Sequence, residues 1–321
     1  MYEEFRRLYP YPEVGDTLIS VVGSIGRTAE YTGKDEYFQD SNVVWLKTDG
    51  SINKKFLKIS YQVIKWLIEG STVKHLYNDN ILRSEIVMPV SQIEQAKIAE
   101  FFEELDHLIT LRQRKCEQTK KLKKYMLQKM FPQNGAKVPE IRFDGFTYDW
   151  EQRKLRECAE FNPKSELPDV FEYIDLESVV GTNILSHRTE SKSSAPSRAQ
   201  RLAQKGDVFY QTVRPYQKNN CIFEKNDNNW VFSTGYAQLR PVNDSYFLLT
   251  LLQNEDFVKL VLDRCTGTSY PAINSNDLAD IDVNVPSDSK EQQQIGTYFK
   301  QLDHLITLHQ RQHKLHLNMH L

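Results

Sequence analysis

The chain has 321 residues and a mass of 37.6 kDa, a length typical of about two domains. Its 40% hydrophobic and 26% charged residues and its mean hydropathy of -0.57 are typical of a globular protein, and no uncharged apolar run approaches the ~18 residues of a membrane span. The net charge of -2 excludes a uniformly basic coat for nucleic acid, so any DNA-binding surface must be local.

The cysteines and the first residues indicate a reducing compartment. Cys116, Cys158, Cys221 and Cys265 are far apart and form no CxxC pair, which excludes zinc-ribbon spacing and a disulfide scaffold. The opening MYEEFRRLYP is charged and aromatic, unlike a signal peptide. We therefore expect a cytoplasmic protein.

The first 90 residues have a mixed pattern. Val14–Val22 and Val43–Leu46 have strand character, and Gly23–Gly26 is predicted to be a loop. Val63–Ile68 is predicted to be helical. These elements predict a first α/β module over residues 1–90.

A long helix is predicted next, within residues 91–131. Ser91 and Glu94 have the spacing of a capping box, and Phe131-Pro132 would end the helix, so it should span Gln92–Met130. Roughly 39 residues at 1.5 Å each make ~58 Å, too long for the interior of a compact domain. Its apolar residues follow a seven-residue seam, which predicts a partner helix. The seam consists of Ile98, Phe101, Phe102, Leu105, Leu108, Thr119, Leu122 and Met126.

The remaining residues predict a linker, a second module and a second helix, over residues 132–138, 139–287 and 288–321. Strand character is found in Tyr173–Leu176, Asp207–Thr212 and Trp230–Ser233, and Phe247–Leu262 looks helical. The last helix, Ser289–Leu321, is expected to pair antiparallel with the first; the alternative is two amphipathic helices that each pack on their own module. Its pairing residues are predicted to be Ile295, Phe299, Leu302 and Leu305.

The sequence contains an internal repeat. LDHLITL occurs at Leu105–Leu111 and again, unchanged, at Leu302–Leu308, an offset of 197 residues. Between Pro89–Arg114 and Pro286–Arg311, 14 of 26 positions are identical. Gly15-Asp16 matches Gly206-Asp207 at an offset of 191, so the two copies differ in length by six residues. The chain is therefore a duplicated unit, in which each copy is a module followed by a helix.

Signatures of catalysis and of metal binding are not found in the sequence. It has no Walker A loop, no HExxH and no GxSxG, and Gly23-x-x-Gly26 is more typical of a turn than of a phosphate-binding loop. His309, His313, His316 and His320 share one helix face, but they have no acidic or cysteine partner nearby in sequence. We expect a binding protein with no metal and no cofactor.

Basic charge is concentrated in two segments. Lys192–Lys218 carries six Lys or Arg against Asp207 alone, with Tyr210 and Tyr216 interleaved, and Arg112–Lys129 carries eight against Glu117. Cations neutralise phosphates while Arg, Asn and Gln can contact base edges, so the first segment suits DNA. The second could follow a DNA backbone or an acidic partner, and a solvated surface is the alternative for both.

These motifs resemble the specificity subunit of type I restriction–modification systems. The resemblance is carried by Glu94-Gln95 leading into LDHLITL, by its copy after Glu291-Gln292, and by the IRFxGFxxxW pattern that ends at Trp150. It implies an α+β fold in which two mixed α/β target-recognition modules are joined by two long helices that form an antiparallel coiled coil. Each module would read half of a bipartite site in double-stranded DNA.

The resemblance also implies the partners. Such a subunit catalyses nothing itself; methyltransferase subunits dock on it, and an ATP-dependent restriction and translocation subunit joins the complex. DNA contacts are then expected from a set of cationic, aromatic and hydroxyl side chains in both modules. They are Arg27, Lys74, Arg198, Arg201, Arg214, Tyr216, Lys218, Ser269 and Tyr270.

The first module departs from the family pattern. It lacks about 51 residues that the second module has, the counterparts of roughly Ile141–Ser191. We therefore expect it to be incomplete at its N-terminal side, and to be less ordered or completed by another chain. Two alternatives to DNA recognition stay open: a scaffold that binds methyltransferase subunits through its helices without reading DNA, and an enzyme with an unrecognised nuclease site.

Overall fold

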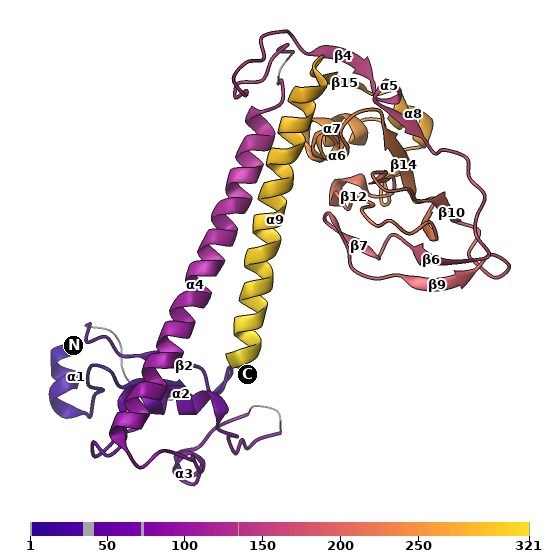
Figure 1. Cartoon of the computed structure of the whole chain (residues 1–321). Coiled ribbons are helices and arrows are strands. Elements are labelled where there is room, and N and C mark those ends of the chain that lie inside the picture. Colours follow the sequence, from indigo (N-terminus) through magenta and orange to yellow (C-terminus); the bar gives the residue numbers. More distant parts are fainter. Residues whose placement is uncertain (1, 35–41, 72–73, 134, 321) are drawn as a thin grey trace. The chain divides into compact units, whose positions relative to one another are not determined.

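The computed structural model describes residues 2–34, 42–71, 74–133 and 135–320, and the chain divides into two compact units (Figure 1). Unit 1 comprises Met1–Leu111 with His316–Leu321, and unit 2 comprises Arg112–Leu315. Helix α4 (Gln92–Lys129) contributes to both units. The predicted end of this helix, at Met130, is one residue beyond the observed one.

Unit 1 is built on a small antiparallel sheet with the order β2-β1-β3. Its helix α2 packs on the central strand, where Ile19, Leu57 and Tyr61 form a buried cluster. A second cluster contains Val21 and Ile81. The elements before α4 are α1 (Tyr2–Leu8), β1 (Thr17–Ser20), β2 (Thr28–Glu30), β3 (Val43–Trp45), α2 (Lys54–Val63) and α3 (Asn78–Leu82).

The predicted helix over Val63–Ile68 is wrong, because the helix lies just before that segment. Asn53 caps α2 by accepting hydrogen bonds from the backbone N–H groups of Lys55 and Phe56, which fixes its start. The buried residues of α2 are Phe56, Leu57, Ser60 and Tyr61, which recur at helical steps of three and four, so the helical pattern precedes the predicted segment. Residues 64–68 then form no regular element.

Unit 2 contains a larger set of strands. Its elements after α4 are β4 (Glu151–Lys154), α5 (Leu155–Cys158), β5 (Ala159–Phe161), β6 (Val170–Ile174), β7 (Val179–Val180), β8 (Asn183–Ile184), β9 (Arg188–Ser191), β10 (Ala199–Leu202), β11 (Val208–Gln211), η1 (Pro215–Gln217), β12 (Cys221–Ile222), β13 (Trp230–Ser233), β14 (Tyr236–Pro241), α6 (Ser245–Gln253), α7 (Glu255–Leu262), α8 (Ser275–Ala279), β15 (Asp282–Val285) and α9 (Ser289–His320). The strands form sheets with the orders β12-β11-β14-β5 and β10-β13-β6-β9 and the pairs β15-β4 and β7-β8.

The core of unit 2 joins the sheet of β11 to its helices. Every residue of β11 and β13 is buried, as expected for central strands. One cluster joins Tyr210 and Leu239 to α6 and to Phe299 of α9. The helix predicted over Phe247–Leu262 is two helices, because Asn254 ends α6 and its side chain caps α7.

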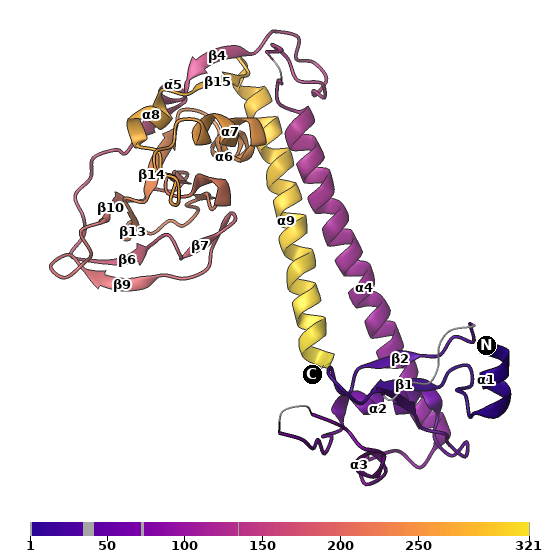
Figure 2. The same ribbon diagram turned by 180° about the vertical axis from the view of Figure 1, so that it is seen from behind.

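Within unit 2, the part of α4 after Arg112 lies antiparallel beside α9 (Figures 1 and 2). Lys123 Nζ is 2.6 Å from Asp303 Oδ1, and Cys116 Sγ is 4.0 Å from the carbonyl oxygen of Ile306. A residue later in α4 thus contacts a residue earlier in α9, so the two helices run in opposite directions. The predicted antiparallel pairing is confirmed for this part, and pairing along Gln92–Leu111 stays a prediction.

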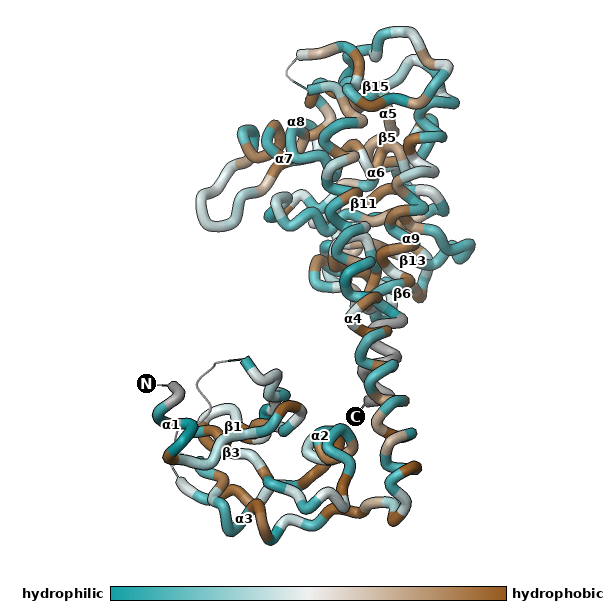
Figure 3. The backbone as a smooth tube through the Cα atoms, turned by 90° about the vertical axis from the view of Figure 1, so that its left-hand side faces the viewer, coloured by the Kyte–Doolittle hydropathy of each residue, from teal (hydrophilic) through white to brown (hydrophobic). Residues whose placement is uncertain are grey.

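The helical seam is shifted from the predicted one. Ile295, Phe299, Leu302 and Leu105 are buried and Ile98 and Phe102 are half-buried, as expected. Leu108 and Leu305 are instead 44% and 42% exposed, and Ile109 is buried. The buried and half-buried positions follow Leu105 at steps of four and three residues, at Ile109, Arg112 and Cys116. Leu108 lies one position before Ile109 and therefore faces outward. Phe101 and Leu122 are exposed for the same reason. Figure 3 shows hydrophobic and hydrophilic residues alternating along α4.

The repeat extends to individual hydrogen bonds. In unit 1, Asp16 accepts a hydrogen bond from the N–H of Glu13 at 2.8 Å; in unit 2, Asp207 accepts one from the N–H of Gln204, also at 2.8 Å. The β1–β3 pair corresponds to β11–β14, and α3 corresponds to α8. The two units are therefore two copies of one fold, and unit 2 adds strands β4 to β10 and β13.

Candidate nucleic-acid interface

Two loops of unit 2 meet beyond the end of β11. One carries η1, and the other spans Thr266–Ala272. The backbone N–H of Arg214 donates to the carbonyl of Pro271 at 2.7 Å, and a β-bridge joins Val213 to Ala272. These bonds hold both loops at the same edge of the unit.

Arg214 and Tyr270 are brought together on these loops. The guanidinium carbon of Arg214 lies 5.4 Å from the centre of the Tyr270 ring, which is 67% exposed. Tyr216 is 50% exposed, and Ser269 is exposed beside Tyr270. A cation stacked on an exposed aromatic ring, with hydroxyl groups beside it, can contact phosphate and stack on a base.

The backbone at Arg214 is unusual, with φ at 54° in the left-handed region. The corresponding residue of unit 1 is Gly23, with φ at 72°. Glycine adopts this conformation without strain, whereas arginine does not. The Nε atom of Arg214 is buried without a hydrogen-bond partner in the described residues. The side chain is thus kept in place at a cost in stability, as is common at binding sites.

Lys218 differs from the expectation. Its ammonium group is 2.8 Å from Glu255 Oε1 and donates to the carbonyl of Gln253 at 3.0 Å, and its side chain is 23% exposed. These contacts tie η1 to α7. Lys218 is therefore a weaker candidate for a phosphate contact than the sequence suggested.

The basic segment Lys192–Lys218 is divided between two places. Lys192 and Arg198 are exposed on the chain between β9 and β10, away from η1 in sequence and in a different sheet. Arg201 lies on β10; its Nε atom is buried without a partner in the described residues, and burial lowers the pKa of its guanidinium. The sequence thus predicted one basic surface where the fold places two groups.

Unit 1 carries the corresponding pair of loops. Its bridges join Val22 to His75 and Glu69 to His75, as Val213 and Thr266 are joined to Ala272 in unit 2. Arg27 lies in the turn between β1 and β2 and Lys74 lies directly before the bridge, and both are exposed. The structure therefore places these two predicted residues on counterpart loops.

The basic stretch of α4 is partly neutralised. Lys120 pairs with Glu117, Lys123 with Asp303 and Lys129 with Glu140. Among the described residues, the cations of this stretch that are exposed and form no ion pair are Arg114, Lys115, Lys121 and Lys124.

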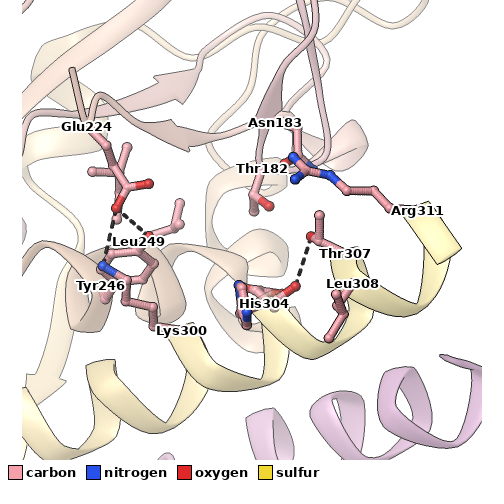
Figure 4. Close-up of a pocket in the computed structure, with 12 residues that line it drawn as sticks. Thr182, Asn183, Glu224, Tyr246, Leu249, Lys300, His304, Thr307, Leu308 and Arg311 are labelled. Atoms are coloured by element: carbon pink, nitrogen blue, oxygen red, sulfur yellow. Dashed lines mark hydrogen bonds and ion pairs between the residues drawn. The ribbon is translucent and has the colours of Figure 1, made fainter. Parts of the chain in front are cut away.

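A polar pocket lies between the β7–β8 hairpin, α6 and α9 (Figure 4). Glu224 accepts a hydrogen bond from Tyr246 at 2.8 Å and lies 3.3 Å from Lys300, while His304 and Arg311 line the other end. In the described part of the chain no group of three His, Cys, Asp or Glu residues could hold a metal ion. Of the four helix histidines, His313, His316 and His320 lie outside the residues whose side chains are described. Burial and the charges of Arg112 and Lys115 lower the pKa of His309.

Sequence reasoning missed a cluster at the start of α9. Arg142 donates to both carboxylate oxygens of Glu291, at 2.7 and 2.9 Å, and Trp150 Nε1 donates to the same group at 3.2 Å. The hydrogen bond to Glu291 raises the pKa of Arg142. Asp288 and Glu291 have the same capping-box spacing as Ser91 and Glu94, but the Glu291 carboxylate binds the segment before β4. The signal was present in the sequence, since Glu291 is identical to Glu94 in the other copy.

The fold and these loops define a class of protein: a duplicated recognition protein, in which two copies of one α/β unit carry paired exposed loops and each copy leads into a long helix. A family model for the type I restriction modification DNA specificity domain matches residues 2–121 and 148–318. The chain belongs to this family, as the resemblance predicted.

Two proteins of Haemophilus influenzae are similar in sequence. One, a type I restriction enzyme specificity subunit, is 40% identical over 114 residues, which are 34% of this chain and 30% of that protein. The other, the specificity subunit of the HindI type I restriction enzyme, is 25% identical over 173 residues, which are 50% of this chain and 36% of that protein. The matched stretches thus span about a third of these relatives' lengths.

Solved structures share the fold. The S subunit of a type I restriction–modification system from M. genitalium superposes with a TM-score of 0.63 at 16% identity, covering 97% of this chain and 82% of that one. A chain from a study of complex assembly in the type I system gives a TM-score of 0.56 at 18% identity, covering 97% and 80%. The predicted α+β fold is therefore confirmed. In the described residues, no helix has the length and apolar character to span a bilayer.

Proposed function

We propose that the chain is a sequence-recognition subunit for double-stranded DNA in a type I restriction–modification complex. The observation that carries the proposal is the pair of bridged loops at the end of β11, where Arg214 stacks on the exposed ring of Tyr270. Arg198, Tyr216 and Ser269 are exposed and are proposed as further contacts. The proposed target-recognition domains are residues 1–90 and 139–287.

The duplication supports this function. Duplex DNA has a local two-fold axis, and a protein with two copies of one unit can match it. Arg27 and Lys74 would serve the second half-site from unit 1, on the counterpart loops. The module of residues 139–287 has the additional sheets, so we expect it to contribute more to specificity.

The partners are proposed from the helices. Each copy of LDHLITL turns two leucines outward: Leu108 and Leu111 are 44% and 37% exposed, and Leu305 and Leu308 are 42% and 39% exposed. Exposed apolar pairs on a helix are typical of a docking face. We propose that methyltransferase subunits dock there, that they and a restriction subunit supply the catalysis, and that this chain supplies none. Its cytoplasmic location stays a prediction.

The test uses Arg214→Gly, because Gly23 shows that glycine fits this backbone. Salt-titrated fluorescence anisotropy on duplex DNA, with methyltransferase subunits present, should give weaker binding and a salt slope reduced by about one unit. Lys218→Ala is the matched control, and it should leave the slope nearly unchanged because Lys218 already pairs with Glu255.

The outcome discriminates between the two roles. An unchanged slope for Arg214→Gly would reject the phosphate contact. Binding of methyltransferase subunits without any DNA affinity would instead favour the scaffold alternative.

A further inference from the structure

Gln211, the last residue of β11, is a buried polar residue whose side chain binds the loop that carries η1. It is 1% exposed. Its Nε2 atom donates to the carbonyl of Val213 at 2.6 Å and to Oε1 of Gln217 at 2.9 Å. Its own Oε1 atom is buried without a hydrogen-bond partner in the described residues. An unpaired buried acceptor costs stability, so the benefit of an amide at this position lies in the two bonds that it donates.

These two bonds fix the orientation of both amides. A backbone carbonyl can only accept, so the Gln211 atom that faces Val213 must be the nitrogen. The same nitrogen faces Gln217, and it must therefore meet the amide oxygen of Gln217, because a nitrogen there would place two donors against each other. The oxygen of Gln217 is thus turned toward Gln211.

The nitrogen of the Gln217 amide is consequently available on the loop. Gln217 is exposed, and in the described part of the chain its Nε2 atom has no hydrogen-bond acceptor. The backbone N–H of Gln217 donates to the carbonyl of Arg214 at 3.0 Å, which closes the turn between them. Two N–H donors of fixed orientation therefore lie on the loop proposed to contact DNA.

An amide held in this way differs from a free glutamine in the base that it can recognise. A free glutamine pairs with adenine by accepting from N6 and donating to N7, so it needs both ends of the amide. The oxygen of Gln217 is directed at Gln211, and only its donors are available. In the major groove guanine presents two neighbouring acceptors, N7 and O6, whereas cytosine presents the N4 donor. The fixed amide therefore suits guanine.

We propose that Gln217 is a specificity-determining residue that donates from Nε2 to N7 and O6 of a guanine in the major groove. Gln211 is its positioning residue, which keeps the amide of Gln217 from turning over. This inference rests on the proposed function and names the base that the η1 loop reads. Arg214 keeps its proposed role at phosphate, so the two side chains divide positioning from base recognition.

Unit 1 has the supporting bond without the base-reading amide. Ser20, the counterpart of Gln211, donates from Oγ to the carbonyl of Val22 at 3.0 Å, as Gln211 donates to Val213. A serine hydroxyl has a single hydrogen to donate, so it cannot hold a second group as Gln211 does. The loop Gly23–Arg27 also contains no asparagine or glutamine. The guanine contact is therefore confined to the half-site of the module of residues 139–287.

The test is a selection of bound sequences from randomised duplex DNA, with the full-length chain and methyltransferase subunits present. The wild-type chain should recover a motif that contains a guanine specified by Gln217. Gln217→Ala should reduce the preference for guanine at one position about tenfold and leave the other positions as they were. Gln293→Ala, which truncates an exposed glutamine of α9, is the matched control and should leave the whole motif unchanged.

Two further variants test the orientation of the amide. Gln217→Glu presents only acceptors, so the preferred base should change from guanine to cytosine, whose N4 group donates. Gln211→Leu removes the bond that fixes Gln217 and should move the preference toward adenine. Circular dichroism checks the folding of Gln211→Leu, because Gln211 is buried. The two variants of the exposed Gln217 decide the proposal independently of that result.

The outcomes distinguish this inference from the function on which it rests. A wild-type motif that Gln217→Ala leaves unchanged overturns the inference alone, as does a guanine retained by Gln217→Glu. Recovery of no motif by the wild-type chain would reject DNA recognition itself and the inference with it. Loss of guanine in Gln217→Ala together with a cytosine in Gln217→Glu is the result that supports it.

Discussion

The two units share one framework but differ in how it is closed. Asp16 and Asp207 occupy the same turn, yet Asp16 pairs with Lys54 at 2.7 Å while Asp207, 1% exposed, pairs with Arg240 at 2.9 Å. In unit 2 the strand β14 is paired on both sides, by β11 and β5, whereas β3 pairs only with β1 among the described residues. The two units thus share the hydrogen bonds of the aspartate turn and of the β-bridges, and these define the common fold. The additional strands of unit 2 cover its central sheet.

The sharpest way to break this comparison is to remove the two counterpart glutamates. Glu291→Ala leaves the Arg142 guanidinium, whose side chain is 15% exposed, without its carboxylate and should cost about 3–5 kcal/mol of unfolding free energy. Glu94→Ala removes an exposed carboxylate and should stay within about 0.5 kcal/mol. Urea denaturation of both variants measures the difference, and equal costs would contradict the structural role inferred from the burial and contacts of Glu291.

The helix seam gives a second large effect. Leu302→Ala, at 5% exposure, should cost ~2–5 kcal/mol, as should Leu105→Ala at 7%. Leu305→Ala is the control within the same motif, and at 42% exposure it should cost well under half as much. Thermal or urea unfolding distinguishes them. A cost for Leu305→Ala equal to that for Leu302→Ala would restore the originally predicted seam.

Hydrogen exchange can sharpen the comparison of the two sheets. We expect the amides of Thr17–Val22 to exchange faster than those of Val208–Thr212 in the isolated chain, because unit 2 buries its strand under more apolar residues. Equal protection would mean that the first module is complete as it stands.

The smallest expected effect is a pH dependence found in unit 2. A hydrogen bond with His187 lowers the pKa of Glu172 on β6, a strand with no counterpart in the described part of unit 1. Because the folded pKa lies below the unfolded value of about 4.3, the stabilisation is present above that pH and is lost as pH falls through the folded pKa. Glu172→Gln should therefore flatten the acid side of the stability curve of unit 2, measured by urea denaturation at several pH values. An unaltered curve would contradict it.

Much of the fold could be predicted from the sequence, because an internal repeat indicates that the same tertiary structure occurs twice. Identity between Leu105–Leu111 and Leu302–Leu308 predicted the duplication, and the seven-residue seam predicted that the helices pair. The capping box at Ser91 and the Phe131-Pro132 pair predicted the length of the first helix. The phase of the seam failed at Leu108, since leucines on both faces of the helix satisfy the same period. Only the buried fraction of each leucine distinguishes the packing face from the outer face.

The candidate site was predicted in part. Arg214 and Tyr270 are 56 positions apart, and the bridge between Val213 and Ala272 that joins their loops is a property of the tertiary fold. Lys218 was counted as a free cation because its partner Glu255 lies on a different helix. A local charge count cannot identify such pairings, and whether the selected residues contact DNA stays a prediction.

Helix α7 has a consequence for how such a protein can diversify. Between the cap residues Asn53 and Asp244 and the bridge residues Glu69 and Thr266, unit 2 is six residues longer than unit 1. The longer segment of unit 2 contains α7, whose Glu255 pairs with Lys218 at the end of η1. Insertions and deletions at this point change the support beneath a surface loop and leave the ladder of β11 intact. Evolution can therefore alter the shape of one recognition edge by length changes alone, while the inherited architecture on either side is kept.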